Sequence, residues 1–162
     1  MTARTTVYHT ALPLLVLTLS ACSITRHSTG LADDGDLTPC PEPPRCVSSQ
    51  AEDPDKQIAP FELQENSDET WQRLGEVVSK MERTTVVKRS EYYLHAEVVS
   101  PWHFYTDDLE LLRSPDTRTL HVRSSARVGY YDFNVNRERV EKLRDKLIKA
   151  GLIKPGQATG SE

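Results

Sequence analysis

The residues best suited to chemistry lie on two strands predicted in the second half of the chain. Polar and apolar residues alternate over 91–99 and 119–128, and this period of two places each set on one face of a strand. Arginine suits a carboxylate or phosphate ligand because its planar guanidinium binds two oxygens at once. The candidate anion-binding residues on the polar face are therefore Arg123, Arg127, His121 and His95.

Three interpretations of this polar face remain open. In the first, the face is solvated and crossed by weak ion pairs. In the second, it is a groove where the two arginines bind a carboxylate, a phosphate headgroup or a sugar acid, aided by backbone donors at the start of a helix near residue 134. In the third, one of the two histidines is a general base beside Glu97 or Asp107. No catalytic residue is assigned, because the sequence has no glycine-rich phosphate loop and no HExxH or GxSxG motif.

A helix is predicted ahead of these strands, over residues 67–82. Asn66 and Glu69 have the spacing of a capping box at its start. Apolar residues then recur at helical spacing, which predicts one buried stripe along the helix. The stripe consists of Trp71, Leu74, Val78 and Met81.

Four strands separate that helix from a second one. They are predicted over residues 84–88, 91–99, 103–112 and 119–128. Short turns join them, so consecutive strands should be antiparallel neighbours. The last helix is predicted over 135–150, with Asp132 or Asn134 as its N-cap. The predicted fold is α+β, a two-layer sandwich in which both helices cover one face of a four-stranded, largely antiparallel sheet.

The charge of the chain argues against one class of partner. The sequence has 20 Lys+Arg and 24 Asp+Glu, a net charge of -4 at pH 7, so no basic excess attracts nucleic acid. From Arg137 onward, the arginines of the last helix are expected to be solvated, and Arg137 and Arg139 are expected to pair with Glu138, Glu141 or Asp145 at helical spacing. No cofactor and no metal are expected.

Residues 1–21 are typical of a secretory signal peptide. Arg4 precedes a short apolar run over 11–19. This run is too short to span a bilayer, because a membrane-spanning helix needs about 20 apolar residues. The sequence LSAC, which ends at Cys22, resembles the lipobox of bacterial lipoproteins. In such signals the thiolate is the nucleophile that takes the lipid, and the cysteine becomes the new N-terminus. We therefore expect Cys22 to be lipidated.

The predicted lipid sets the expected location and one partner, the membrane. Several acyl chains anchor a protein stably, and the domain would face the periplasm. An aspartate after the cysteine would favour the inner membrane, so Ser23 favours the outer membrane. The polar segment 22–39 is predicted to be a flexible tether, 40–153 the folded domain and 154–162 a disordered tail.

Two cysteines remain besides the one in the lipobox. Cys40 and Cys46 flank a proline-rich loop, and in an exported protein such a pair most simply forms a disulfide. Free thiols are one alternative, and a metal site with His95, His103 or His121 is another. Five intervening residues do not fit the short CxxC spacing of structural zinc sites.

Several of these segments together resemble the DUF1499 family, a domain without an established reaction. They are CPEPPRCVSSQA, the YYLHAE strand, the strand with two adjacent aspartates, and VRSSARVGYYDFNVNRERVEKLR. The resemblance covers roughly residues 38–150. The chain departs from the family pattern at Arg45, Tyr131 and Asn134, where asparagine, serine and glycine are common. The resemblance implies a fold and an envelope context, but no activity.

The sequence thus predicts a lipid-anchored cell-envelope protein that is a non-catalytic binding or interaction module. Its expected partner, besides the membrane, is an envelope protein or an anionic ligand. The alternative is a small hydrolase-like enzyme that acts on an anionic envelope substrate.

Overall fold

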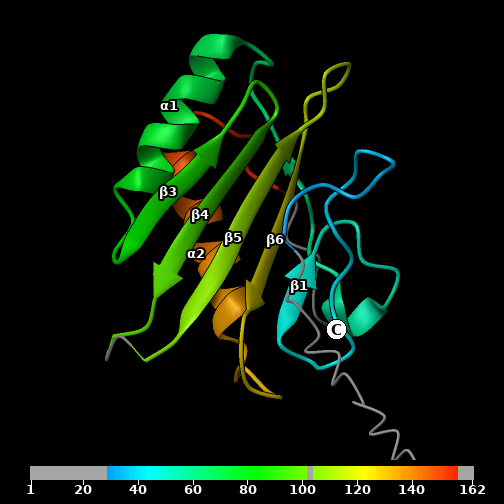
Figure 1. The fold of residues 1–162 in the computed structure, drawn as a ribbon. Coiled ribbons are helices and arrows are strands. Elements are labelled where there is room, and N and C mark those ends of the chain that lie inside the picture. Colours follow the sequence, from blue (N-terminus) through cyan, green and yellow to red (C-terminus); the bar gives the residue numbers. More distant parts are fainter. Residues whose placement is uncertain (1–28, 102–103, 157–162) are drawn as a thin grey trace, which may run out of the picture.

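The computed structural model describes residues 29–101 and 104–156 (Figure 1). The predicted signal peptide and Cys22 lie outside the described residues, as do His103 and the end of the chain from residue 157. Four strands form an antiparallel meander, in which each strand pairs with the next. They are β3 (Thr84–Arg89), β4 (Tyr93–Val99), β5 (Thr106–Arg113) and β6 (Thr119–Ala126).

The α+β class is confirmed, but the predicted count of four strands is wrong. β1 (Cys46–Ser48) and β2 (Phe61–Glu62) both pair antiparallel with β6, with the short helix η1 (Pro54–Lys56) between them. The six-stranded sheet has the order β1-β6-β5-β4-β3, with β2 also on β6. Strands of two and three residues are too short to show a period of two in the sequence, which is why the pattern missed them.

The first helix, α1, spans Asp68–Ser79. Its N-cap is Ser67, whose Oγ accepts a hydrogen bond from Thr70 N at 3.2 Å. The predicted cap Asn66 instead donates its amide to three carbonyls of the β5–β6 turn, so it joins the helix start to the sheet. The predicted apolar stripe is buried at Trp71, Leu74 and Val78.

The second helix, α2, spans Val135–Lys149, and both predicted capping residues contribute to its start. Asn134 is the N-cap residue by backbone position, with φ 65°, but its side chain makes no capping bond. Asp132 supplies that bond, because its carboxylate accepts from the N–H groups of Asn134 and Asn136 at 3.1 Å each.

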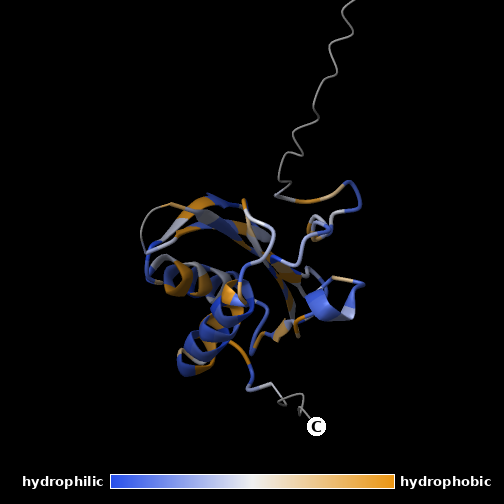
Figure 2. Ribbon diagram, turned by 90° about the horizontal axis from the view of Figure 1, so that it is seen from below, coloured by the Kyte–Doolittle hydropathy of each residue, from blue (hydrophilic) through white to orange (hydrophobic). Residues whose placement is uncertain are grey.

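One hydrophobic core joins both helices to the sheet. Leu74 of α1, Leu109 of β5 and Leu143 of α2 belong to the same buried cluster and are 0% exposed. Each such leucine contributes about 2–3 kcal/mol by leaving water. Figure 2 shows the two helices together below the sheet, so the molecule has two layers.

The opposite face of the sheet is covered by the chain that precedes β1. We call residues 29–45 the N-terminal strap. Gly30 N donates to Glu110 Oε1 of β5 at 2.6 Å, and Leu37 is only 3% exposed. The segment 22–39 is predicted to be a flexible tether, but its part from Gly30 packs on the domain, because Leu37 is buried and Gly30 N binds the buried Glu110.

Candidate functional site: a covered charge network and an aromatic end

A buried carboxylate lies at the centre of the sheet face under the strap. Glu110 is 0% exposed and accepts hydrogen bonds from Tyr93 Oη at 2.6 Å and from Arg123 Nη1 at 2.5 Å, besides the strap's Gly30 N. The antiparallel register places Arg123 of β6 directly opposite Glu110. Burial and the hydrogen bond to Glu110 raise the pKa of Tyr93 well above its ordinary value of 10.0, so the phenol keeps the proton that it donates.

A second buried carboxylate, Asp108, lies two residues earlier on β5 and on the same face. His95 Nε2 and Arg127 Nη2 each lie 2.7 Å from its Oδ1, and Arg127 Nε lies 3.0 Å from Oδ2. Burial alone would raise the pKa of Asp108, but the hydrogen bonds from His95 and Arg127 lower it to about 2. Arg127 also reaches Glu97 at 2.6 Å, and its bond to Asp108 raises the pKa of the guanidinium further, so this group keeps its charge.

The four predicted anion-binding residues therefore do not form one cluster that faces solvent. The Arg123 side chain is 0% exposed and bound to Glu110, while Arg127 is 35% exposed and shared between two carboxylates. The side chain of His95 is 12% exposed. The interpretation of this face as solvated is wrong at its centre, because the strap covers it. An anion would have to displace both the strap and Glu110 to reach Arg123.

His121, the fourth of these residues, lies toward the other end of β6. Its Nδ1 is 3.3 Å from Ser49 Oγ, and it lines a hollow of about 310 Å³ together with Leu31 and Asp36. Burial lowers the pKa of His121, although the charge of Asp36 opposes this shift. The imidazole is therefore neutral near pH 7 and able to accept a proton.

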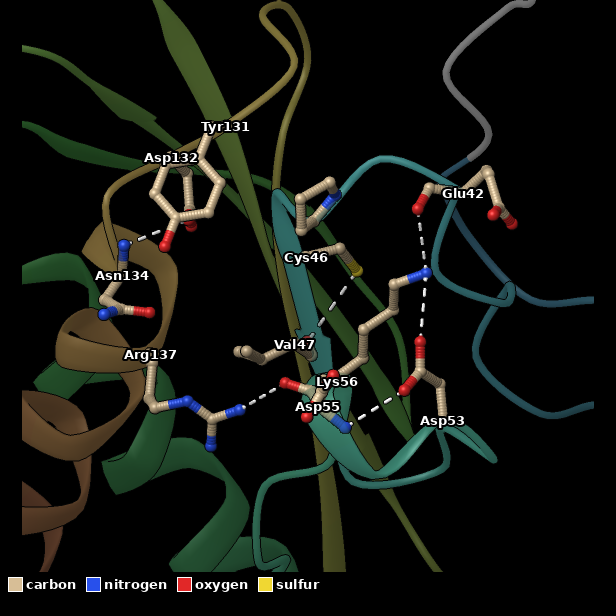
Figure 3. Close-up of a pocket in the computed structure, with 11 residues that line it drawn as sticks. Glu42, Cys46, Val47, Asp53, Asp55, Lys56, Tyr131, Asp132, Asn134 and Arg137 are labelled. Carbon is tan, nitrogen blue, oxygen red and sulfur yellow. Dashed lines mark hydrogen bonds and ion pairs between the residues drawn. The ribbon is translucent and has the colours of Figure 1, made fainter.

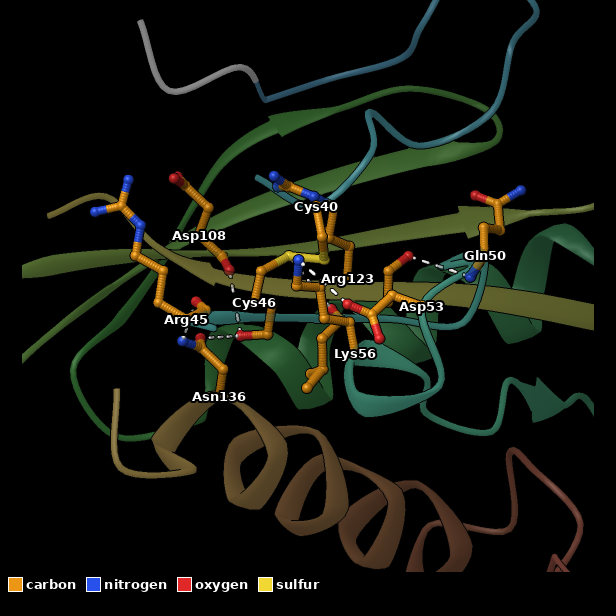
Figure 4. Close-up of a disulfide and its surroundings, with 12 residues drawn as sticks. Cys40, Arg45, Cys46, Gln50, Asp53, Lys56, Asp108, Arg123 and Asn136 are labelled. Carbon is orange, nitrogen blue, oxygen red and sulfur yellow. Dashed lines mark hydrogen bonds and ion pairs between the residues drawn. A yellow bond between two sulfur atoms is a disulfide. The ribbon is translucent and has the colours of Figure 1, made fainter. Parts of the chain in front are cut away.

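Cys40 and Cys46 form the predicted disulfide, with an S–S distance of 2.05 Å (Figure 4). The bond ties the strap to the first residue of β1. Between the two cysteines, the carbonyl of Arg45 accepts from Ala126 N at 3.0 Å and from Asn136 Nδ2 at 3.1 Å. The disulfide loop is thus joined to β6 and to α2, and it fixes the C-terminal end of the strap.

The arginines of α2 bind the irregular segment between β1 and β2. Arg137 donates to the carbonyls of Gln57 and Asp55 at 2.8 and 2.9 Å, and Arg144 donates to two further carbonyls of that segment at 2.6 and 3.2 Å. Arg139 Nη2 lies 2.6 Å from the carboxylate of Asp107 on β5. The expectation that these arginines are solvated is wrong, because the segment presents backbone carbonyls to the helix, a contact that helical spacing does not reveal.

A buried polar junction joins β6 to α2. Ser124 Oγ donates to Asn136 Oδ1 at 2.7 Å and accepts from Arg139 Nη1 at 2.9 Å. Asn136 is 0% exposed and also donates to Asp132 at 2.8 Å. Ser124, Asn136 and Arg139, which belong to the densely patterned sequence from residue 122 to 144, therefore satisfy one another at a buried corner.

A hollow of about 350 Å³ lies between this junction and the disulfide loop (Figure 3). Its two basic side chains are already engaged. Lys56 donates to the carbonyl of Glu42 at 3.0 Å and lies 3.4 Å from the carboxylate of Asp53, while Arg137 is bound to backbone carbonyls. Tyr131 lines the hollow from the β6–α2 loop.

Large apolar side chains gather at the end of the sheet where β4 and β6 finish and β5 begins. The register pairs Val99 with Thr106 and Asp107 with Ala126, so the loops that follow β4 and β6 leave the same end. Seven residues on these loops and at the start of α2 are between 46% and 79% exposed, and we call them the aromatic end. They are Phe104, Tyr105, Val128, Tyr130, Tyr131, Phe133 and Val135.

Phe133 is the most exposed of these residues, and its backbone is left-handed. Its φ of 55° is unusual for a bulky residue, at a cost of about 1–2 kcal/mol. The ring is 79% exposed and meets Tyr131 edge-on at 5.2 Å, so burial in the domain does not offset this cost. Left-handed residues of this kind cluster at functional sites.

Within residues 29–101 and 104–156, no helix is both long and apolar enough to cross a membrane. The same ranges hold no group of three or more His, Cys, Asp or Glu side chains arranged to bind a metal ion.

The family model of DUF1499, a protein of unknown function, matches residues 36–147. The chain belongs to the DUF1499 family. No curated protein and no solved structure matches it significantly. The DUF1499 match begins inside the strap, which agrees with the strap being part of the folded domain.

Sequence reasoning about this DUF1499 domain missed the roles of Glu110 and Tyr93. The sequence does contain a signal for the role of Glu110. Asp108 and Glu110 are two residues apart on a strand, so both share the face that carries Arg123. Residue type alone does not reveal that the aromatic residues between 128 and 135 are exposed.

Proposed function

We propose that this protein is a lipid-anchored cell-envelope protein that acts as a non-catalytic interaction module, and that its interaction surface is the aromatic end. The observation that carries the proposal is that the charged side chains of the sheet face are buried, whereas the large apolar side chains at the aromatic end are exposed. The charged groups at the centre of the polar sheet face, Asp108, Glu110 and Arg123, are 0% exposed and bound to one another or to neighbours. The large apolar groups, by contrast, are exposed and concentrated at one end.

Two features support the envelope location. The LSAC sequence ending at Cys22 has the form of a lipobox, and the thiolate of such a cysteine takes the lipid. A disulfide between Cys40 and Cys46 persists in the periplasm but seldom in the cytosol. The placement in the outer membrane rests on Ser23 alone.

Photocrosslinking in cells tests the interaction surface. A photoreactive phenylalanine replaces Phe133 or Phe104 at the aromatic end, and the matched control replaces the exposed Asp116 in the β5–β6 turn at the opposite end. We expect adducts with an envelope component from the first two positions and none from the control. Equal adducts from all three positions, or adducts from the control alone, would contradict the proposal.

A second candidate, the hydrolase-like enzyme, is favoured by one observation. A neutral His121 lies 3.3 Å from Ser49 Oγ beside a hollow, which is the pairing that activates a serine nucleophile. However, Ser49 Oγ already accepts a hydrogen bond from Val122 N at 3.0 Å. Hydrolysis of chromogenic esters that disappears in both His121→Gln and Ser49→Ala, with both variants folded, would establish the enzyme. Absence of turnover in the unaltered chain would exclude it for that substrate class.

A further inference from the structure

The chain available between the proposed lipid and the folded domain is short. Because Gly30 is already hydrogen-bonded to Glu110 on the sheet, eight residue steps separate this contact from Cys22. Fully extended, they span at most about 29 Å. Part of that length lies within the headgroup layer, which is about 5–8 Å thick on each side of the hydrocarbon.

A domain of this size is about 35 Å across. The remaining reach is therefore smaller than the domain itself, and the domain stays beside the bilayer. The strap begins over Glu110, three residues along β5 from Asp107, which pairs with the last residue of β6. At about 3.4 Å per residue, this is about 10 Å from the aromatic end, well within the reach of the chain.

The aromatic end has the composition of a surface that enters the headgroup layer. Tyrosine combines an apolar ring with a polar tip, and aromatic residues concentrate where membranes meet water. Tyr130 and Phe133 are 74% and 79% exposed on one loop, and Phe104 is 76% exposed on the other. Both loops leave the same end of the sheet.

The same loops carry little charge that would oppose insertion. Among residues 104–105 and 127–135, the only Asp, Glu, Lys or Arg residues are Arg127, which is paired with Asp108 and Glu97, and Asp132. Its carboxylate is turned inward, where it accepts hydrogen bonds from Asn134 N, Asn136 N and Asn136 Nδ2. On entering the headgroup layer, both of these charged side chains would therefore keep hydrogen-bond partners within the domain.

We propose that the aromatic end inserts into the interface of the bilayer that holds the lipid anchor, so that the domain lies on the membrane with β4, β5 and β6 meeting it end-on. The partner is the zwitterionic and anionic phospholipid surface itself. This inference rests on the proposed anchoring at Cys22 and adds the orientation of the domain.

Spin-label accessibility tests the orientation in the intact, acylated chain on vesicles of phosphatidylethanolamine and phosphatidylglycerol. Cys40 and Cys46 are bonded to each other, and an acylated Cys22 has no thiol, so an introduced cysteine is labelled alone. Labels at Phe133→Cys and at Tyr130→Cys report on the aromatic end, and a label at Asp116→Cys is the control at the opposite end. Two positions guard against one substitution disturbing the loop.

We expect both aromatic-end labels to be more accessible to oxygen than to a water-soluble nickel chelate, and the control to show the reverse. Labels at 130 and 133 that are as accessible to the chelate as the control would overturn the inference. Labels that are exposed on vesicles but shielded from both reagents in cell envelopes would also overturn it, in favour of a protein partner. Flotation and the mass of the Cys22 peptide are measured separately, so a failed anchor is distinguished from a failed orientation.

Discussion

At the scale of single residues, the ion pair between Glu110 and Arg123 has a structural role. Both side chains are 0% exposed, and charges buried in this way gain little net stability from their attraction because both lose water. Their removal is nevertheless costly when only one partner is lost, since the other charge remains buried.

Arg123→Met is expected to lower the free energy of unfolding by about 3–5 kcal/mol, because Glu110 is left without its guanidinium. Adding Glu110→Gln should restore most of that loss. Denaturant unfolding measures both variants, with the exposed Arg118→Met as a control expected to change by less than about 0.5 kcal/mol. A single variant as stable as the control would show that the pair is not the buried network described above.

The lowered pKa of Asp108 makes the free energy of unfolding depend on pH. Its pKa falls from 3.8 to about 2 in the folded protein, so folding favours the carboxylate. The stabilisation, about 2 kcal/mol from this shift, is fully present above about pH 4 and is lost as the pH falls toward about 2.

Urea unfolding of Asp108→Asn across this acid range should show a weaker fall in stability than the unaltered chain shows. The exposed Asp116→Asn serves as the matched control and should keep the steeper fall. If the two variants respond to acid alike, Asp108 does not hold the low pKa assigned to it.

At the scale of elements, the strap and its disulfide cover the charged sheet face. The chain-entropy model gives about 2 kcal/mol for a bond that closes so short a loop, so the disulfide fixes the strap locally more than it stabilises the whole fold.

Replacing Cys40 and Cys46 by serine should therefore lower the free energy of unfolding by about 2 kcal/mol. Hydrogen exchange should accelerate over residues 29–45, at the strap, while the interior strands β4 and β5 stay protected. Uniform acceleration over the whole sheet would mean that the disulfide supports the core instead.

The elements also show what the sequence could reveal. The helices and the β3–β6 meander follow from periodicity, because each buries one regular apolar face, as Leu109 and Leu111 do on β5. β1 and β2 lack a readable period, and the strap's contact with Glu110 is long-range, so neither could be predicted from local pattern.

The candidate site was predicted only in part, for a similar reason. The strand alternation correctly gave Arg123 and Arg127 a shared face. Whether that face met water depended on a segment some 80 residues earlier in the chain. The disulfide was predictable because its two cysteines lie close in sequence and the pattern of residues 1–22 predicts export.

At the scale of the whole molecule, a covered charged sheet face and an exposed aromatic end lie in different parts of the domain. The charged face is closed by the strap, while the aromatic end exposes apolar side chains that the domain's own core does not bury. Under the proposed anchoring at Cys22, this division makes the aromatic end the expected contact surface.

Hydrogen exchange of the acylated chain on vesicles, compared with the unanchored Cys22→Ala chain in solution, tests this division most directly. We predict slower exchange on the vesicles in the segments around 104–106 and 127–135, with unchanged exchange in the strap and in the β5–β6 turn. Protection that instead appears over residues 29–45, or that is absent from both loops, would contradict the account.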